Sequence, residues 1–172
     1  MKKVILWAAL VLLSVPALAQ TQPPSDKDKQ QILEVVETFR KSIINKDSVS
    51  FNQLFLYDSI PWLGITDEKS MAFVRKYYPD KKALDPSSYK DFIKFIVSTK
   101  SKVEEKFFNV EVVNDPLIAS VTFDYSLWVD EKPQNWGKES WELMKVDGKW
   151  KIFFVSYSGY LAQVTPVPDH LK

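Results

Sequence analysis

The strongest constraint on this chain is a strict alternation of apolar and other residues across residues 117–129. Every odd position there is apolar, whereas the even positions include serine, threonine and aspartate. Successive side chains of a β-strand point to opposite faces of its sheet, so a period of two predicts a strand. We expect this strand to bury one face and to present the other, largely polar face to solvent.

More strands are predicted on either side of it in the sequence. A second alternation precedes residues 114–116, which have the composition of a turn. Residues 138–146 and 149–157 flank Asp147-Gly148, which is the strongest short-range signal for a β-hairpin. The second half of the chain is therefore predicted to be an antiparallel meander.

The first half of the chain is predicted to be mainly helical. Apolar residues recur at helical spacing across residues 26–45, which predicts an amphipathic helix. A short helix is expected near Phe51, a strand over residues 59–65, and a further helix around residues 89–96. With no internal repeat and no second domain boundary, we expect one α+β domain over residues 25–158.

The two ends of the chain have patterns of their own. Residues 1–19 resemble a cleavable signal peptide, with a charged start, an apolar stretch and an Ala-Leu-Ala cleavage site. We expect residues 20–24 to be a flexible lead and residues 159–172 to be a loose tail. The protein is thus expected to be exported and to reside in the periplasm or outside the cell.

Charge and composition argue against several kinds of partner and site. Cleavage would remove two lysines and leave 21 basic against 22 acidic residues, so we expect neither nucleic acid nor, after cleavage, a membrane as partner. The absence of cysteine excludes disulfides and thiolate sites, and the lone His170 lies in the tail. Without clustered metal ligands or a glycine-rich phosphate loop, we expect no metal and no cofactor.

Two segments resemble the nuclear transport factor 2-like superfamily, in particular its SnoaL-like and ketosteroid isomerase-like members. One runs from the first helix through residues 46–51 and 54–58, and the other is the hairpin of residues 141–152 with residues 155–158. The resemblance implies a cone, in which a curved antiparallel sheet wraps around the N-terminal helix and leaves a pocket at its open end. It implies no particular reaction, because this fold carries both enzymes and non-enzymes.

The ketosteroid isomerase pattern can be compared position by position. That pattern needs a tyrosine, a carboxylate base and a protonated carboxylic acid. By the resemblance, Phe39 takes the position of the tyrosine, Leu63 that of the base and Glu142 that of the acid. Phe39 lacks the hydroxyl and Leu63 lacks the carboxylate that these two roles require, so a steroid isomerase of that type is excluded.

Glu142 has two interpretations, because strand parity alone does not choose between them. If Ser140, Glu142 and Met144 face the pocket, the Glu142 carboxyl is desolvated and could act in acid–base catalysis. If Trp141 and Leu143 define the buried face instead, Glu142 is solvated. The sequence leaves both interpretations open.

Other polar side chains are weaker candidates for a catalytic role. Asp58 and Tyr57 lie at the end of the second helix, near the expected rim of the pocket, and are the candidate partners of Glu142 in an enzyme. Glu104 and Glu105 are expected to form the solvated start of a strand.

The expected ligand-binding residues are aromatic or apolar. Residues 66–86 are expected either to form a lid over the pocket or to extend the core as a surface helix. The candidate ligand-binding residues are Phe39, Trp62, Leu63, Tyr77, Tyr78, Phe92 and Met144.

These observations favour a non-catalytic exported domain that binds a small, mainly apolar molecule in its cone. The alternatives are a SnoaL-like acid–base enzyme (isomerase, cyclase or dehydratase) that uses Glu142 with Asp58 or Tyr57, and a homodimeric protein-interaction module. A homodimer is expected if Glu142 points inward, because large apolar side chains would then crowd the outer face of the sheet. Those side chains are Trp141, Leu143, Trp150, Ile152 and Phe154.

Overall fold

The computed structural model describes residues 26–172, so the predicted signal peptide, the predicted lead and residue 25 lie outside the described residues. In this described part, none of the helices has the length and apolar character needed to cross a membrane. The helices are α1 (Asp26–Asn45), α2 (Ser48–Asn52), α3 (Glu68–Val74), α4 (Tyr89–Ser98) and the 3-10 helix η1 (Asp169–Leu171). The strands are β1 (Trp62–Thr66), β2 (Leu84–Pro86), β3 (Val103–Asn114), β4 (Ile118–Val129), β5 (Lys132–Val146) and β6 (Lys149–Leu161).

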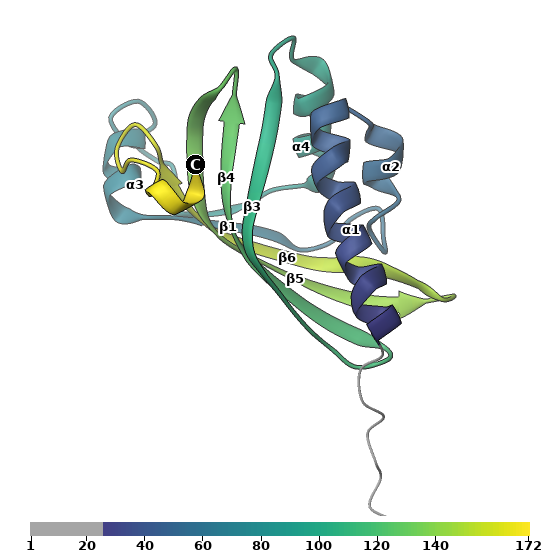
Figure 1. Cartoon of the computed structure of the whole chain (residues 1–172). Coiled ribbons are helices and arrows are strands. Elements are labelled where there is room, and N and C mark those ends of the chain that lie inside the picture. The colour runs from purple at the N-terminus through teal and green to yellow at the C-terminus, as the bar shows by residue number, and fades with distance from the viewer. Residues whose placement is uncertain (1–25) are drawn as a thin grey trace, which may run out of the picture.

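The strands form one six-stranded sheet in the order β2-β1-β6-β5-β4-β3. Its neighbours are antiparallel except for β1 and β6, which run parallel with Trp62 opposite Val155. The sheet curves, and α1 packs against it together with α2 and α4 (Figure 1). The prediction of a single α+β domain, with the N-terminal helix against a curved sheet, is confirmed.

The inner face of the sheet carries the residues that the alternation predicts. Val121, Phe123 and Tyr125 of β4 are at most 3% exposed, and Trp141 and Leu143 of β5 are fully buried. Burial of apolar surface contributes roughly 25 cal/mol per Å², so large side chains on this face hold the sheet against the helices. The odd residues of both strands therefore face the core.

Phe39 of α1 lies at the centre of an aromatic cluster in this core. Its ring centroid is 4.7 Å from that of Trp141 and 4.8 Å from that of Phe51. The rings of Trp62 and Phe92 lie within 6.5 Å of it. Phe39 thus contacts β5, α2, β1 and α4 at once and holds the helical layer on the sheet.

A bulge in β6 changes which of its residues face inward. Glu142 pairs with Phe154 but the next residue of β5 pairs with Ile152, so Phe153 is the additional residue. Before the bulge Ile152 is fully buried, and after it Val155 is. The shift in parity turns Tyr157, two residues further on, into the cone.

The expected crowding of apolar residues on the outer face of the sheet is wrong. Trp141, Leu143, Trp150 and Ile152 are at most 4% exposed and belong to the core. Only Phe154 of the five keeps a partly exposed position. The four buried side chains cannot form a dimer interface, so the reason given for a homodimer does not hold.

The prediction of a loose tail after residue 158 is also wrong. Strand β6 continues to Leu161, and Val167 and Leu171 are at most 4% exposed. The Ser126 hydroxyl donates a hydrogen bond of 2.7 Å to the carbonyl of Leu171. The C-terminal residues therefore cover the outer face of β4 around Ser126.

Residues 66–86 extend the edge of the sheet. Helix α3 is capped by Asp67, and β2 then pairs with β1. Ser70 and Met71 are at most 2% exposed, and the backbone N–H of Leu161 donates to the Ser70 hydroxyl over 3.0 Å. This packing fits the expected extension of the core; the lid stays a prediction.

Candidate active site

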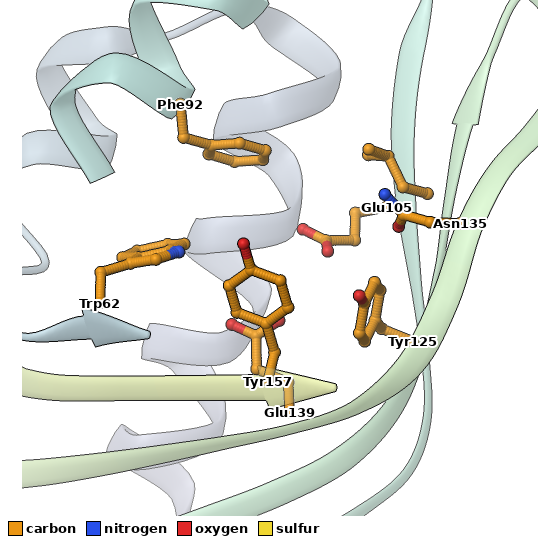
Figure 2. A pocket seen from close by; sticks show the side chains of 8 residues that line it. Trp62, Phe92, Glu105, Tyr125, Asn135, Glu139 and Tyr157 are labelled. Carbon is orange, nitrogen blue, oxygen red and sulfur yellow. The ribbon is translucent and has the colours of Figure 1, made fainter. Parts of the chain in front are cut away.

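A cavity of about 140 Å³ lies on the inner face of the sheet, between α4, β1 and strands β3 to β6. Figure 2 shows its side chains converging from these elements on one space. One part of its lining is apolar and another carries carboxyl, amide and phenol groups. The eight lining residues are Trp62, Phe92, Glu105, Tyr125, Leu127, Asn135, Glu139 and Tyr157.

Strand parity brings the polar residues into this cavity. Glu105 lies two residues beyond the buried Val103 on the inner face of β3. Glu139 shares the inner face of β5 with Trp141. The bulge in β6 gives Tyr157 the same orientation. With Tyr125 of β4, the polar wall is thus built from four different strands and does not depend on a loop.

Glu105 and Glu139 form a buried carboxyl pair. Their exposed fractions are 5% and 4%, and neither takes part in any ion pair found within residues 26–172. Glu139 accepts a hydrogen bond of 2.6 Å at Oε1 from the indole Nε1 of Trp141. Glu105 makes no such bond with any of the described residues.

Burial favours the protonated form of both carboxyl groups. It raises the pKa of Glu139 from 4.5 to about 7, and the Trp141 hydrogen bond opposes this effect. Burial and the nearby charge of Glu139 together raise the pKa of Glu105 well above its ordinary value. Near neutral pH the pair therefore holds at least one proton, which is typical of carboxyl groups in functional sites.

Two tyrosines complete the polar wall. The Tyr125 hydroxyl donates to the carbonyl of Ser158 over 3.0 Å, and burial with the charges of the two glutamates raises the Tyr125 pKa well above its ordinary value. Burial also raises the pKa of Tyr157, while a hydrogen bond with Ser87 opposes it. Both phenols are thus neutral hydrogen-bonding groups over the whole physiological pH range.

The wall opposite the carboxyl pair is aromatic. The ring centroids of Trp62 and Phe92 lie 5.9 Å apart with a 30° angle between their planes. In Figure 2 the rings of Trp62 and Phe92 border the open space from the side of β1 and α4, and the ring of Tyr157 from β6 lies between them and Tyr125. The cavity therefore presents aromatic rings on one side and hydrogen-bonding acids on the other.

No protein-family model matches this chain, and no curated protein is similar to it in sequence. Many solved structures are similar in fold. An NTF2-like protein of unknown function from Pseudomonas putida covers 87% of this chain and 99% of its own, at a TM-score of 0.60 and 9% identity. An NTF2-like superfamily protein from Salmonella enterica covers 76% of this chain and 89% of its own, at a TM-score of 0.52 and 22% identity.

This chain has the NTF2-like fold. Another similar structure is a protein from Novosphingobium aromaticivorans described as a candidate scytalone dehydratase. It covers 78% of this chain and 85% of its own, at a TM-score of 0.56 and 13% identity. At such identities the likeness concerns the fold alone, and function has to be argued from the site.

Two of the predicted ligand-binding residues, Trp62 and Phe92, line the cavity of this NTF2-like domain. Phe39 lies in the core and is absent from the lining, and Leu63 and Met144 are on strand positions that alternate with inward-facing ones. The other two, Tyr77 and Tyr78, are 67% and 69% exposed and lie outside the lining.

The predicted catalytic residues are not brought together. Glu142 points to the outer face of β5, where the Ser120 hydroxyl donates to its Oε2 over 2.8 Å. The Asp58 side chain is 99% exposed and pairs with Lys90 at 3.1 Å, and Tyr57 is 67% exposed. Of the two interpretations of Glu142, the structure bears out the one in which Trp141 and its alternating neighbours are buried.

The expectation that Glu105 is solvated is wrong, and Glu139, which also lines the cavity, is not among the predicted site residues. A signal for Glu139 does exist, because it has the parity of the fully buried Trp141. Glu105 likewise has the parity of Val103. Within residues 26–172 no group of three metal-ligating side chains is close enough to hold a metal ion.

Gly64 makes room for Tyr157. A Cβ at position 64 would lie 2.5 Å from the Tyr157 ring, which is far inside van der Waals contact. We expect Gly64→Ala to displace this ring from the cavity wall and to lower the free energy of unfolding by about 1–3 kcal/mol. Urea unfolding measures the change.

Gly159→Ala is the matched control for this substitution. Its Cβ would meet no atom closer than 3.9 Å, so stability should stay within about 0.5 kcal/mol of the wild type. Equal stability of the two variants would show that the Tyr157 ring has space to move.

Proposed function

We propose that this protein binds a small, mainly apolar molecule in the cavity between Trp62 and the carboxyl pair of Glu105 and Glu139. The observation that carries the proposal is this pair, buried in a cavity and without a partner of opposite charge among residues 26–172. The predicted signal peptide would place this activity outside the cytoplasm.

The energetic cost of the carboxyl pair supports a ligand. Burial of an ionisable group without a partner costs several kcal/mol, even when it stays protonated and needs only hydrogen bonds. Apolar residues at positions 105 and 139 would extend the core formed by Val103 and Trp141. A functional requirement explains why a costly pair occupies the face that otherwise builds the core.

The dimensions of the cavity limit the ligand. A drug-sized molecule usually occupies about 300–1,000 Å³. The 140 Å³ found here is close to the engineered cavity of about 150 Å³ that holds benzene in another protein. We therefore expect a ligand of benzene-like size, with one polar group directed at the carboxyl pair.

Ligand-observed NMR with a library of small fragments tests the proposal. Some fragments should bind the wild type, and Leu127→Phe should weaken their binding because the larger side chain takes up part of the cavity. Met144→Phe, on the outer face of β5, is the matched control and should bind as the wild type does. A wild-type protein that binds no fragment, or the same fragments bound equally tightly by Leu127→Phe, would contradict the proposal.

A second function is favoured by the pKa of about 7 for Glu139. A general acid or base works best when its pKa lies near the operating pH, so Glu139 could move a proton on a bound substrate. The acid–base enzyme expected from the resemblance would then use Glu139 and Glu105 in place of Glu142, Asp58 and Tyr57.

Exchange of carbon-bound hydrogen separates the two functions. Small ketones incubated with the protein in D₂O should lose their α-protons faster than in buffer if Glu139 is a base, and Glu139→Gln should remove the acceleration. Exchange at the buffer rate would leave the protein a binding domain.

A further inference from the structure

We infer that the ligand of this cavity is a small organic cation, which the carboxyl pair and the aromatic rings hold together, and that its binding displaces a proton from the pair. The inference rests on the proposed ligand-binding function and names the chemical class of the ligand. It follows from three features of the cavity: its hydrogen-bond acceptors, its rings and the placement of the surrounding charges.

The polar lining of the cavity is rich in acceptors. Glu105 lacks a hydrogen bond among the described residues, and the buried Oδ1 atom of Asn135 also has no partner. One carboxyl oxygen of Glu139 already accepts a hydrogen bond from Trp141, and the Tyr125 hydroxyl donates its hydrogen bond to the carbonyl of Ser158. The oxygens named here can accept further hydrogen bonds, and an ammonium group is a hydrogen-bond donor that also carries a positive charge.

The aromatic lining suits the same group. A cation within about 6 Å of a ring centroid is attracted by the negative face of the ring, and tryptophan is the best of the aromatic side chains for this contact. Trp62, Phe92 and Tyr157 surround the space that faces the carboxyl pair (Figure 2). A small apolar cation can therefore contact rings on one side and carboxylates on the other.

The protein does not supply the positive charge itself. None of the eight lining residues is a lysine, arginine or histidine. Arg40 on α1, the helix that packs on β3, pairs with Glu37 at 2.8 Å. The charged residues of α4 (Lys90, Asp91 and Lys94) are exposed, as is His170 of η1.

The groups that face the carboxyl pair from the other strands are neutral or negative. They are Tyr125 on β4 and Tyr157 on β6, and Asp85 on β2 acts on Tyr157 from further away. A bound cation would be the first positive charge beside the pair, and it would favour the ionised carboxylates. Binding of a cation near neutral pH should thus release a proton from the carboxyl pair. Binding of a neutral ligand should release none, because it does not favour the ionised carboxylates.

Calorimetry with a matched pair of probes tests the inference. Benzylammonium and benzyl alcohol have nearly the same shape and differ in charge. At pH 7 we expect wild-type protein to bind benzylammonium at least about tenfold more tightly, a difference of about 1.4 kcal/mol. Titrations in two buffers of different ionisation enthalpy should show release of a proton with the cation and none with the alcohol.

Variants assign the effect to the carboxyl pair. Glu105→Gln combined with Glu139→Gln should remove both the preference for benzylammonium over benzyl alcohol and the proton release. Glu142→Gln, on the outer face of β5, is the matched control and should behave as the wild type does.

The outcomes separate this inference from the proposed function. Equal affinity for both probes, or a cation bound without proton release, overturns the cationic ligand but leaves a ligand-binding cavity. If neither probe nor any fragment of the library binds, the proposed ligand binding and the cationic ligand are both contradicted. A preference for the cation that survives in the double variant would place its binding site elsewhere on the protein and overturn the inference.

Discussion

Replacement of Phe39 by alanine is expected to lower the free energy of unfolding by about 3–5 kcal/mol. The side chain is 1% exposed, and its ring contacts those of Phe51, Trp62, Phe92 and Trp141. Its loss removes apolar burial and leaves a cavity that several elements would have to fill at once. Urea unfolding followed by far-ultraviolet circular dichroism measures the loss.

Phe95→Ala is the matched control, because this ring lies on α4 with 51% of its surface exposed. Its effect should stay within about 1 kcal/mol. If Phe39→Ala does not fold, Phe39→Leu still gives a measurable value, which we expect to be about 1–2 kcal/mol. A loss below about 1 kcal/mol in Phe39→Ala would show that α1 is held by other contacts.

The stability of the protein is expected to fall as the pH rises from about 4.5 through 7. The pKa of Glu139 is raised to about 7 by burial in the folded state, whereas it has its ordinary value of 4.5 in the unfolded chain. The folded protein therefore binds more protons between these values, and stability is fully present below 4.5 and is lost as pH rises. At about 1.4 kcal/mol per pH unit, Glu139 alone accounts for about 3 kcal/mol.

Glu139→Gln should flatten this pH dependence and be the more stable protein at pH 8. Its amide can still accept the indole hydrogen bond of Trp141, so the contact itself is preserved. Glu111→Gln, at an exposed position of β3, should follow the wild-type curve. Urea unfolding at several pH values measures the free energy of unfolding of each protein. If this free energy falls with pH as steeply in Glu139→Gln as in the wild type, the account is ruled out.

The parts of the fold that could be predicted from the sequence are those with local causes. The hairpin at Asp147 and Gly148 is present, and both residues have the positive φ angles, 49° and 74°, that this turn requires. The period of two in β4 predicts its buried face correctly. The parallel pairing of β1 with β6 could not be predicted, because residues 62–66 and 155–159 carry no local signal for each other.

The candidate site was predicted only in part, for a related reason. Both faces of β5 carry large side chains, so the period of two did not show whether Trp141 or Glu142 faces inward. A glutamate at position 105 costs free energy on a buried face, so stability arguments assigned it to solvent. The additional residue Phe153, which turns Tyr157 inward, is visible only once β5 and β6 are paired.

The position of β6 determines when the sheet can be completed during synthesis. Strand β1 pairs only with β2 and β6 among the described strands, so the first two strands of the chain join the other three through β6 alone. A ribosome must therefore have made residue 161 before the sheet can close, and residue 171 before the outer face of β4 is covered. Such dependence on late, distant partners slows folding.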